Sequence, residues 1–311
     1  MRMGVDLGGT KIEAIMIDHE GSELLRNRIA APQNNYKTTL KAIQSLVQET
    51  EKASGHQAGA TEKIPLGVGI PGTISPVTGL VKNANSPWLI GHTLDKDLAE
   101  ILDRPVKIAN DANCFTLSEA SDGAAEAATT VFGVILGTGV GGGLVVKGTV
   151  IEGPNSIAGE WGHNPLPWPN QENSRAEFPG PICYCGLNGC TETFLSGAGL
   201  QRSYQECAQT DLPWPPSPQE IAGHAENGDA VAIASLDLYC NRLARALASV
   251  INIIDPDFIV LGGGLSNIAQ VYSKVPELWA QWVFSDHVRT RLVQNKHGDS
   301  SGVRGAAWLW P

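Results

Sequence analysis

The stretch DLGGTK, which starts at Asp6, places an acid, two glycines, a hydroxyl and a lysine within one short segment. The apolar run before it and the alternating run after it predict two strands, so the segment is expected to close a hairpin. A structural turn needs only the glycines. Asp6, Thr10 and Lys11 suit a metal-phosphate group lying against the bare amides of Gly8 and Gly9. From these residues alone, a plain turn and a phosphate-binding turn are equally expected.

A second glycine turn lies at residues 131–146, VFGVILGTGVGGGLVV, and repeats the order strand, turn, strand. Aligning Gly8 with Gly137 superposes the two hairpins, which favours duplication into two similar lobes over independent origin. The run GTGVGG also satisfies GxGxxG, but a strand follows it where a dinucleotide-binding site requires a helix. The expected phosphate contacts here are Gly137, Thr138, Gly139, Gly141 and Gly142.

A third glycine segment, Gly262, Gly263 and Gly264, follows the predicted strand at 258–261. Ser266 is expected to open a helix directly after it. That order would bring backbone N–H groups and a helix N-terminus to one point, which favours binding of an anion.

Cysteines crowd together in CYCGLNGC, where Cys183, Cys185 and Cys190 fall within eight residues. With His163 they supply the four N/S ligands of a closed tetrahedral zinc site, which leaves no open position for water and is therefore structural. The alternative is three free thiols with the histidine elsewhere. Such crowding in a reducing compartment favours metal over disulfides.

Three acids are candidates for contact with a substrate. Glu160 and Glu192 flank the expected zinc ligands and would offer acceptors to a polyhydroxylated ligand, although either acid alone would by default be solvated. Asp111, in ANDANC, follows a predicted strand at 106–109. It could take a proton from a hydroxyl nucleophile or cap a helix N-terminus, and the two roles are equally expected.

The remaining pattern predicts an α/β protein, since strands and helices alternate along the chain. With 311 residues, two domains are expected. A polar connection should follow the first hairpin, and residues 164–182, rich in Pro and polar groups, should form an inserted loop. The expected helices lie at 36–53, 93–102, 112–120 and 229–254, with a helix start at Ser217 and a short helix at 302–310; a further strand is expected at 66–70.

Charge and hydropathy exclude two function classes. The net charge of −10 argues against binding a nucleic-acid backbone, which needs clustered Lys and Arg. No apolar run approaches the roughly 20 residues of a membrane span, and no signal peptide is evident. We therefore expect a cytoplasmic protein with neither a membrane nor a nucleic-acid partner.

Taken together, these segments resemble the ROK family of sugar kinases and repressors, within the actin-like ATP-binding superfamily. The family pattern appears in order as DxGGTK, GxPG, ND, GTGxGxG, GExGH and CxCGxxGCxE, spanning nearly the whole chain. Several stretches, such as VKNANSPWL, GEWGHNPLPW and HGDSSGVRGAAWLWP, look like bacterial fructokinases of the manno(fructo)kinase type. The long spacing between His163 and Cys183 also suits that branch. Because the first hairpin begins at Met3, we expect no preceding helix-turn-helix domain.

The resemblance implies a role for each matching residue. Asp111 would be the general base on the sugar hydroxyl, and Asp6 would hold magnesium through water. His163 would contact the sugar while also ligating zinc. The other implied sugar contacts are Gly72, Asn85, Asn110, Glu160 and Glu192. The implied ATP contacts are Gly8 to Lys11 and Gly137 to Gly142 at the phosphates, and Gly262 to Gly264 beside adenosine.

The resemblance also implies a fold and a reaction. The fold would be the actin-like ATPase, or ribonuclease H-like, fold, with two similar lobes and a ligand cleft between them. The small lobe would span 1–112 with the C-terminal helix at 298–311 packed on it, and the large lobe 113–297. The reaction would be ATP-dependent phosphorylation of D-fructose, and of mannose, at the 6-hydroxyl, by a homodimer. The alternatives are a glucokinase or N-acetylhexosamine kinase, or a non-catalytic sugar sensor.

Overall fold

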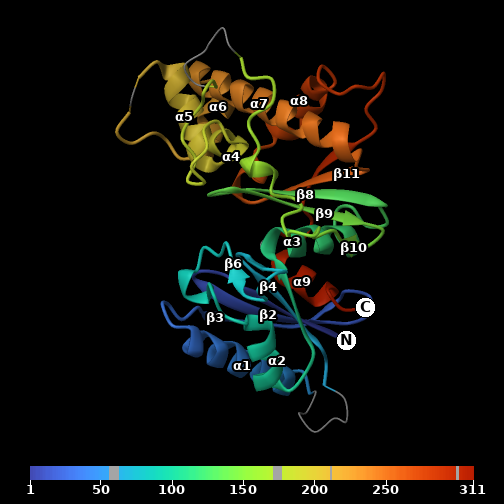
Figure 1. The fold of residues 1–311 in the computed structure, drawn as a ribbon. Coiled ribbons are helices and arrows are strands. Elements are labelled where there is room, and N and C mark those ends of the chain that lie inside the picture. The colour runs from blue at the N-terminus through green and yellow to red at the C-terminus, as the bar shows by residue number, and fades with distance from the viewer. Residues whose placement is uncertain (56–62, 171–176, 211, 299–300) are drawn as a thin grey trace. The chain divides into compact units, whose positions relative to one another are not determined.

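The computed structural model describes residues 1–55, 63–170, 177–210, 212–298 and 301–311 (Figure 1). The chain divides into two compact units. The first comprises Met1–Ala127, Gly143–Ala158 and Lys296–Pro311, and the second comprises Ala128–Gly142 and Gly159–Asn295. The expected boundary after residue 112 falls inside helix α3 (Asp111–Ser121), which lies whole in the first unit.

The first unit is built on a five-stranded sheet of order β3-β2-β1-β4-β7. Strand β1 pairs antiparallel with β2 and parallel with β4, which is parallel to β7. The carboxyl ends of β1, β4 and β7 therefore lie at one edge of the sheet. The strands are β1 (Arg2–Leu7), β2 (Lys11–Ile17), β3 (Glu23–Ala30), β4 (Leu66–Ile70) and β7 (Val106–Asn110), with a small separate pair β5 (Thr73–Ile74) and β6 (Val81–Lys82).

Strand β3 corrects the expectation of a polar connection after the first hairpin. In its sequence, ELLRNRIA, successive side chains alternate between two faces of the strand. The charged residues obscure this alternation because both faces make contacts. One face packs Leu25 and Ile29 on the core, and the other presents Arg26 and Arg28 to Glu13 of β2. Glu13 is buried, so these two arginines balance its charge.

Helices cover both faces of the first sheet (Figure 1). On one face lie α1 (Tyr36–Ala53) and α2 (Leu94–Leu102), whose apolar stripes join the strand residues in one core. On the other lies α9 (Ser301–Trp308), packed on α3 and on β1, β2 and β4. Small residues permit this close approach, since a Cβ on Gly305 would stand 1.6 Å from the Cys114 carbonyl oxygen. Of the expected 298–311 helix, residues 299–300 lie outside the described residues.

The second sheet repeats the arrangement of the first. Its order is β10-β9-β8-β11-β12, and β11 runs parallel to both β8 and β12. Hairpin, central strand and parallel strands thus occupy equivalent places in the two sheets, as the aligned glycine turns predict. The strands are β8 (Thr130–Leu136), β9 (Val140–Val146), β10 (Thr149–Val150), β11 (Phe258–Gly262) and β12 (Arg291–Gln294).

Helix α7 (Ala230–Ile254) is the central helix of the second unit and packs against α5, α6 and α8. Asp229 caps its start, and it ends at Asp255 in the left-handed conformation, immediately before Pro256. The expected helix start at Ser217 is a capping box with Glu220. The other helices are α4 (Thr191–Leu195), α5 (Gly197–Ala208), α6 (Pro218–Glu226) and α8 (Gln270–Trp279).

Two further observations concern segments singled out in the sequence. The expected loop at 164–182 has no helix or strand in its described part, and its residues 171–176 lie outside the described residues. Over the described ranges, no helix has the length and apolar character needed to span a bilayer.

Candidate functional site

The first candidate region is the carboxyl edge of β1, β4 and β7, where Asp6 and Asp111 lie. The pKa of Asp6 is raised to about 7, chiefly by burial and in addition by the charges of Asp111 and Glu13, while Lys11 lowers it. Asp6 and Asp111 are therefore close enough to repel each other. A buried region with this excess of negative charge is stabilised by a cation.

Predicted sugar contacts converge at the same edge. Asn110 ends β7, and its side-chain amide donates to the Gly72 carbonyl over 3.3 Å. The backbone N–H of Asn85 donates to the Pro71 carbonyl over 3.0 Å, so the two loops lie side by side. A Cβ on Gly72 would stand 2.9 Å from Ala84, which shows why this contact requires glycine.

The structure also separates the two roles considered for Asp111. Asn110, not Asp111, is the N-cap of helix α3, and its side-chain oxygen accepts from the Ala112 N–H over 2.9 Å. Asp111 is the first residue of the helix, and its Oδ1 accepts from the same N–H over 2.8 Å. The N-cap interpretation of Asp111 is therefore wrong by one residue, and its role as a base stays a prediction.

The glycines of the two hairpin turns are not there for the reason usual in hairpins, which is to allow a left-handed backbone conformation. Gly8, Gly9 and Gly137 all lie outside the left-handed region, so backbone conformation does not require glycine there. Apart from its chain neighbours, no atom of the described residues lies within 4 Å of the position that a Cβ on Gly137 would occupy. Gly142 is different, because its Cβ would overlap Trp161 at 2.7 Å. At Gly137, neither packing nor conformation accounts for the missing side chain.

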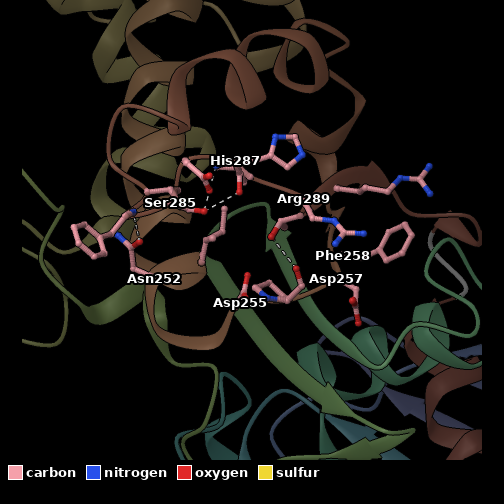
Figure 2. A pocket seen from close by; sticks show the side chains of 15 residues that line it. Asn252, Asp255, Asp257, Phe258, Ser285, His287 and Arg289 are labelled. Carbon is pink, nitrogen blue, oxygen red and sulfur yellow. Dashed lines mark hydrogen bonds between the residues drawn. The ribbon is translucent and has the colours of Figure 1, made fainter.

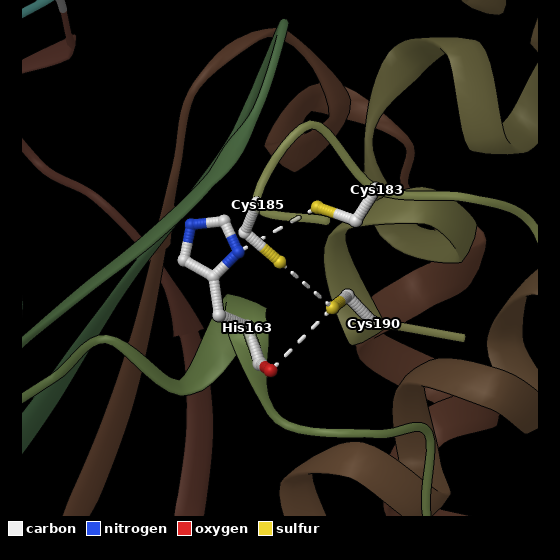
Figure 3. Close-up of side chains that lie close together, drawn as sticks. All are labelled: His163, Cys183, Cys185 and Cys190. Atoms are coloured by element: carbon white, nitrogen blue, oxygen red, sulfur yellow. Dashed lines mark hydrogen bonds between the residues drawn. The ribbon is translucent and has the colours of Figure 1, made fainter. Parts of the chain in front are cut away.

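The cysteine cluster is in the second unit, and the structure brings its four members together (Figure 3). The ligand atoms of His163, Cys183, Cys185 and Cys190 all lie within 4.8 Å of one another. Cys183 Sγ is 3.6 Å from His163 Nδ1, and Cys185 Sγ is 3.6 Å from Cys190 Sγ. Zinc bonds of about 2.3 Å to sulfur and about 2.0 Å to nitrogen give tetrahedral edges of roughly 3.5–3.8 Å, so this set fits zinc.

His163 has its two ring nitrogens in different surroundings. Nδ1 faces the cysteines, and Nε2 lies 3.1 Å from the exposed Tyr184 hydroxyl. One histidine could therefore bind a metal and a second group at once. Glu192 lies on the same side of the cluster, since its Oε1 is 4.0 Å from Cys183 Sγ and its Oε2 accepts from the Val140 N–H. Glu192 thus joins the cluster to the glycine turn, whereas the Glu160 side chain is exposed.

The third glycine segment departs from the expectation. Residues after β11 form a 3-10 turn, Gly264–Asn267, and helix α8 begins only at Gln270. The Ser266 hydroxyl donates to the Gly263 carbonyl and caps no helix, so the expected helix start at Ser266 is wrong. Gly263 has φ +80°, and its Cβ would stand 2.4 Å from the Leu136 carbonyl oxygen. This glycine is required by the fold itself.

A buried ion cluster escaped the sequence analysis. The Glu177 carboxylate accepts a hydrogen bond from Arg242 Nε over 2.8 Å. It accepts two more from the terminal nitrogens of Arg245, over 2.8 and 3.0 Å. All three side chains are buried. The cluster ties the segment that leads to Cys183 to helix α7. The signal in the sequence is a pair of arginines three residues apart on a largely apolar helix. Their partner Glu177 lies in a segment with no periodic pattern, so the sequence does not connect the two.

A hollow of about 970 Å³ lies elsewhere in the second unit (Figure 2). It is lined by the end of α7, the start of β11 and residues 283–291, and includes Asp255, Asp257 and Arg289. None of the predicted site residues borders it. It is at the amino end of β11, whereas ligands of α/β sheets bind at the carboxyl ends of the strands.

Comparison with known proteins gives the class of protein. The ROK family model matches residues 2–311. The chain is 37% identical over 309 residues to the N-acetyl-D-glucosamine kinase of Yersinia enterocolitica, covering 99% of each chain. It matches the crystal structure of a Thermus thermophilus ROK hexokinase with 28% identity and TM-score 0.83, covering 99% and 96% of the chains. It also matches a Streptomyces griseus ROK glucokinase in complex with glucose and AMPPNP, with 25% identity and TM-score 0.74, covering 99% and 98%.

The chain therefore belongs to the ROK family and has the actin-like ATPase fold. The two five-stranded sheets, whose strands follow the same spatial order, belong to the two α/β halves of that fold.

Proposed function

We propose that this sugar kinase of the ROK family transfers the terminal phosphoryl group of ATP to the 6-hydroxyl of a hexose or N-acetylhexosamine. The observation that carries the proposal is the acid pair, Asp6 and Asp111, at the carboxyl edge of the first sheet, beside the loops of Gly72 and Asn85. Phosphoryl transfer needs positioning and charge neutralisation more than covalent chemistry.

Asp111 takes the proton of the sugar hydroxyl as the new O–P bond forms. Asn110, Asn85 and Gly72 hold the sugar in place, and the contact between Asn110 and the Gly72 carbonyl fixes their loops before the sugar arrives. Glu160, His163 and Glu192 are the proposed contacts from the second unit. A bound sugar would find the His163 Nε2 side of the ring free of the cysteine cluster.

The phosphates of ATP lie against the turns at 8–11 and 137–142 and are neutralised in part by Lys11. Gly137 supports this assignment, because nothing in the fold explains its missing side chain. Magnesium would be held by Asp6 through water and would supply charge neutralisation for the polyphosphate. The buried, like-charged surroundings of Asp6 fit a divalent cation. Gly262 to Gly264 are proposed to lie beside adenosine.

Zinc at His163, Cys183, Cys185 and Cys190 would have a structural role. With four protein ligands the site is closed, so it stiffens the segments that carry Glu160 and Glu192 and takes no part in the transfer. The match of the 3.6 Å edges to a tetrahedral ion supports this proposal.

For the acceptor, the comparisons favour the alternative of an N-acetylhexosamine over fructose. Relatives named N-acetyl-D-glucosamine kinase align along 99% of the chain at 37% identity. Fructose and mannose remain the second candidate, because the stretches NANSPW, GEWGHNPLPW and HGDSSGVRGAAWLWP look like those of fructokinases. A homodimer stays a prediction from the family.

The deciding experiment is ADP release, coupled to NADH oxidation, with N-acetylglucosamine, N-acetylmannosamine, glucose, mannose and fructose as acceptors. A kcat/KM for N-acetylglucosamine at least tenfold above the others would support the first candidate. The reverse ratio with fructose would reject it in favour of the second. Absence of turnover with every sugar, in protein that binds sugar by calorimetry, would refute the kinase proposal and support a sugar sensor.

A further inference from the structure

Ser86 is a buried serine whose hydroxyl does not cap the turn that it begins. The residue is 2% exposed and stands at the N-cap position of the 3-10 turn Pro87–Leu89. Serine is favoured at such positions because its oxygen accepts from the first N–H groups, yet here the side chain makes no capping hydrogen bond. Throughout the part of the chain that the structure describes, no other residue bonds to this hydroxyl either.

The surroundings of Ser86 point to a ligand. Its Oγ lies 4.0 Å from the position that a Cβ on Gly9 would occupy, so the hydroxyl faces the first glycine turn. Its chain neighbour Asn85 is bonded to the Pro71 carbonyl, next to Gly72. Ser86 is therefore the residue that joins the loop proposed for the sugar to the turn proposed for the phosphates.

A second buried serine shows that a hydroxyl without a partner is not by itself evidence of a ligand contact. Ser118 is fully buried in helix α3, and its hydroxyl likewise has no hydrogen-bond partner in the described part of the chain. Ser118 is enclosed within a helix of the core, whereas Ser86 borders a glycine turn whose backbone conformation needs no glycine. Ser86 thus differs from Ser118 in facing the turn that is proposed to bind the phosphates.

We propose that Ser86 is a further substrate-contacting residue, whose hydroxyl donates a hydrogen bond to the phosphoryl group during its transfer. This rests on the proposed kinase function. As the bond from ADP oxygen to phosphorus breaks and the bond from sugar oxygen to phosphorus forms, the sugar proton goes to Asp111 and Ser86 keeps its own. The hydroxyl thereby helps to align donor and acceptor.

The test compares Ser86→Ala with the matched control Ser118→Ala. Both variants remove, from a buried residue, a hydroxyl that has no partner among the described residues, so both should melt within about 2 °C of the wild type. We expect kcat of Ser86→Ala to fall about tenfold, the effect of one hydrogen bond made in the transition state, with sugar KM within about twofold. Ser118→Ala should keep full kcat.

The outcomes separate the inference from the function on which it rests. Full kcat in Ser86→Ala, or a fall in kcat accompanied by an equal fall for Ser118→Ala, would overturn the role of Ser86. If the wild type phosphorylates none of the sugars, the role of Ser86 can still be tested by measuring the affinity of all three proteins for AMPPNP with magnesium by calorimetry. Weaker binding in Ser86→Ala alone would then support the contact, and equal affinity in all three proteins would overturn it.

Discussion

Replacement of Glu177 by glutamine tests how the second unit holds the segment that leads to the cysteine cluster. The carboxylate accepts four hydrogen bonds, from Arg242, from two nitrogens of Arg245 and from the Asn170 N–H. Removing one partner of a buried ion pair costs about 3–5 kcal/mol. Glutamine keeps the shape and one acceptor, so we expect about 3 kcal/mol, or roughly 6–12 °C in Tm for a domain of this size.

The pH dependence of this loss has a definite sign. Burial raises the pKa of Glu177, but hydrogen bonds from Arg245, Arg242 and the Asn170 N–H outweigh it and bring the pKa below its usual 4.5. A carboxyl with a lowered folded pKa stabilises the protein above its unfolded pKa and loses that effect as pH falls through the folded value. The Tm difference between wild type and Glu177→Gln should therefore be largest near neutral pH and shrink below about 4.5.

Calorimetric melting at a series of pH values provides the assay, with Glu206→Gln as control. Glu206 pairs with the same Arg242 but is partly exposed, with a side-chain exposure of 25%, so its loss should cost about 1 kcal/mol or less. Equal Tm values for Glu177→Gln and Glu206→Gln at neutral pH would refute the reasoning. A Tm difference from wild type that stays constant down to pH 3 would refute the assigned sign.

Three further predictions follow from the site. Asp111→Asn should lower kcat at least about 100-fold while sugar affinity by calorimetry changes less than about threefold, and retained turnover would contradict its role as base. Cys185→Ser should reduce zinc per chain, measured by atomic emission, while Cys207→Ser should not; a zinc-free but fully active wild type would reject the site. Gly137→Ala should melt like the wild type yet raise the KM for ATP about tenfold, whereas Gly305→Ala should fail to fold stably, because its Cβ would stand 1.6 Å from a backbone oxygen of α3.

Local patterns were enough to predict several elements and the residues of the cysteine cluster. The helix at 36–53 and the strand at 66–70 have the predicted bounds, because their apolar residues repeat with one clear period. The cluster at His163 and Cys183 to Cys190 could be predicted because three thiols within eight residues are close wherever the chain folds tightly. Both glycine turns are likewise predictable, because each is defined by glycines that stand next to one another between two strands.

Other features depend on partners that are distant in sequence, and no local pattern reveals them. Strand β3 was not predicted because Arg26 and Arg28 pair with the buried Glu13 of the neighbouring strand, a contact that the local sequence does not reveal. The N-cap of α3 is Asn110 and not Asp111. Both residue types are common N-caps, so the sequence does not choose between these neighbours, and the backbone geometry does. Glu177 is balanced by arginines 65 and 68 residues further on, and Ser86 meets Gly9 across 77 positions. The sequence by itself determined which side chains could do chemistry, and the packed chain decided which of them meet, because burial and pairing of charges are properties of contacts between distant segments.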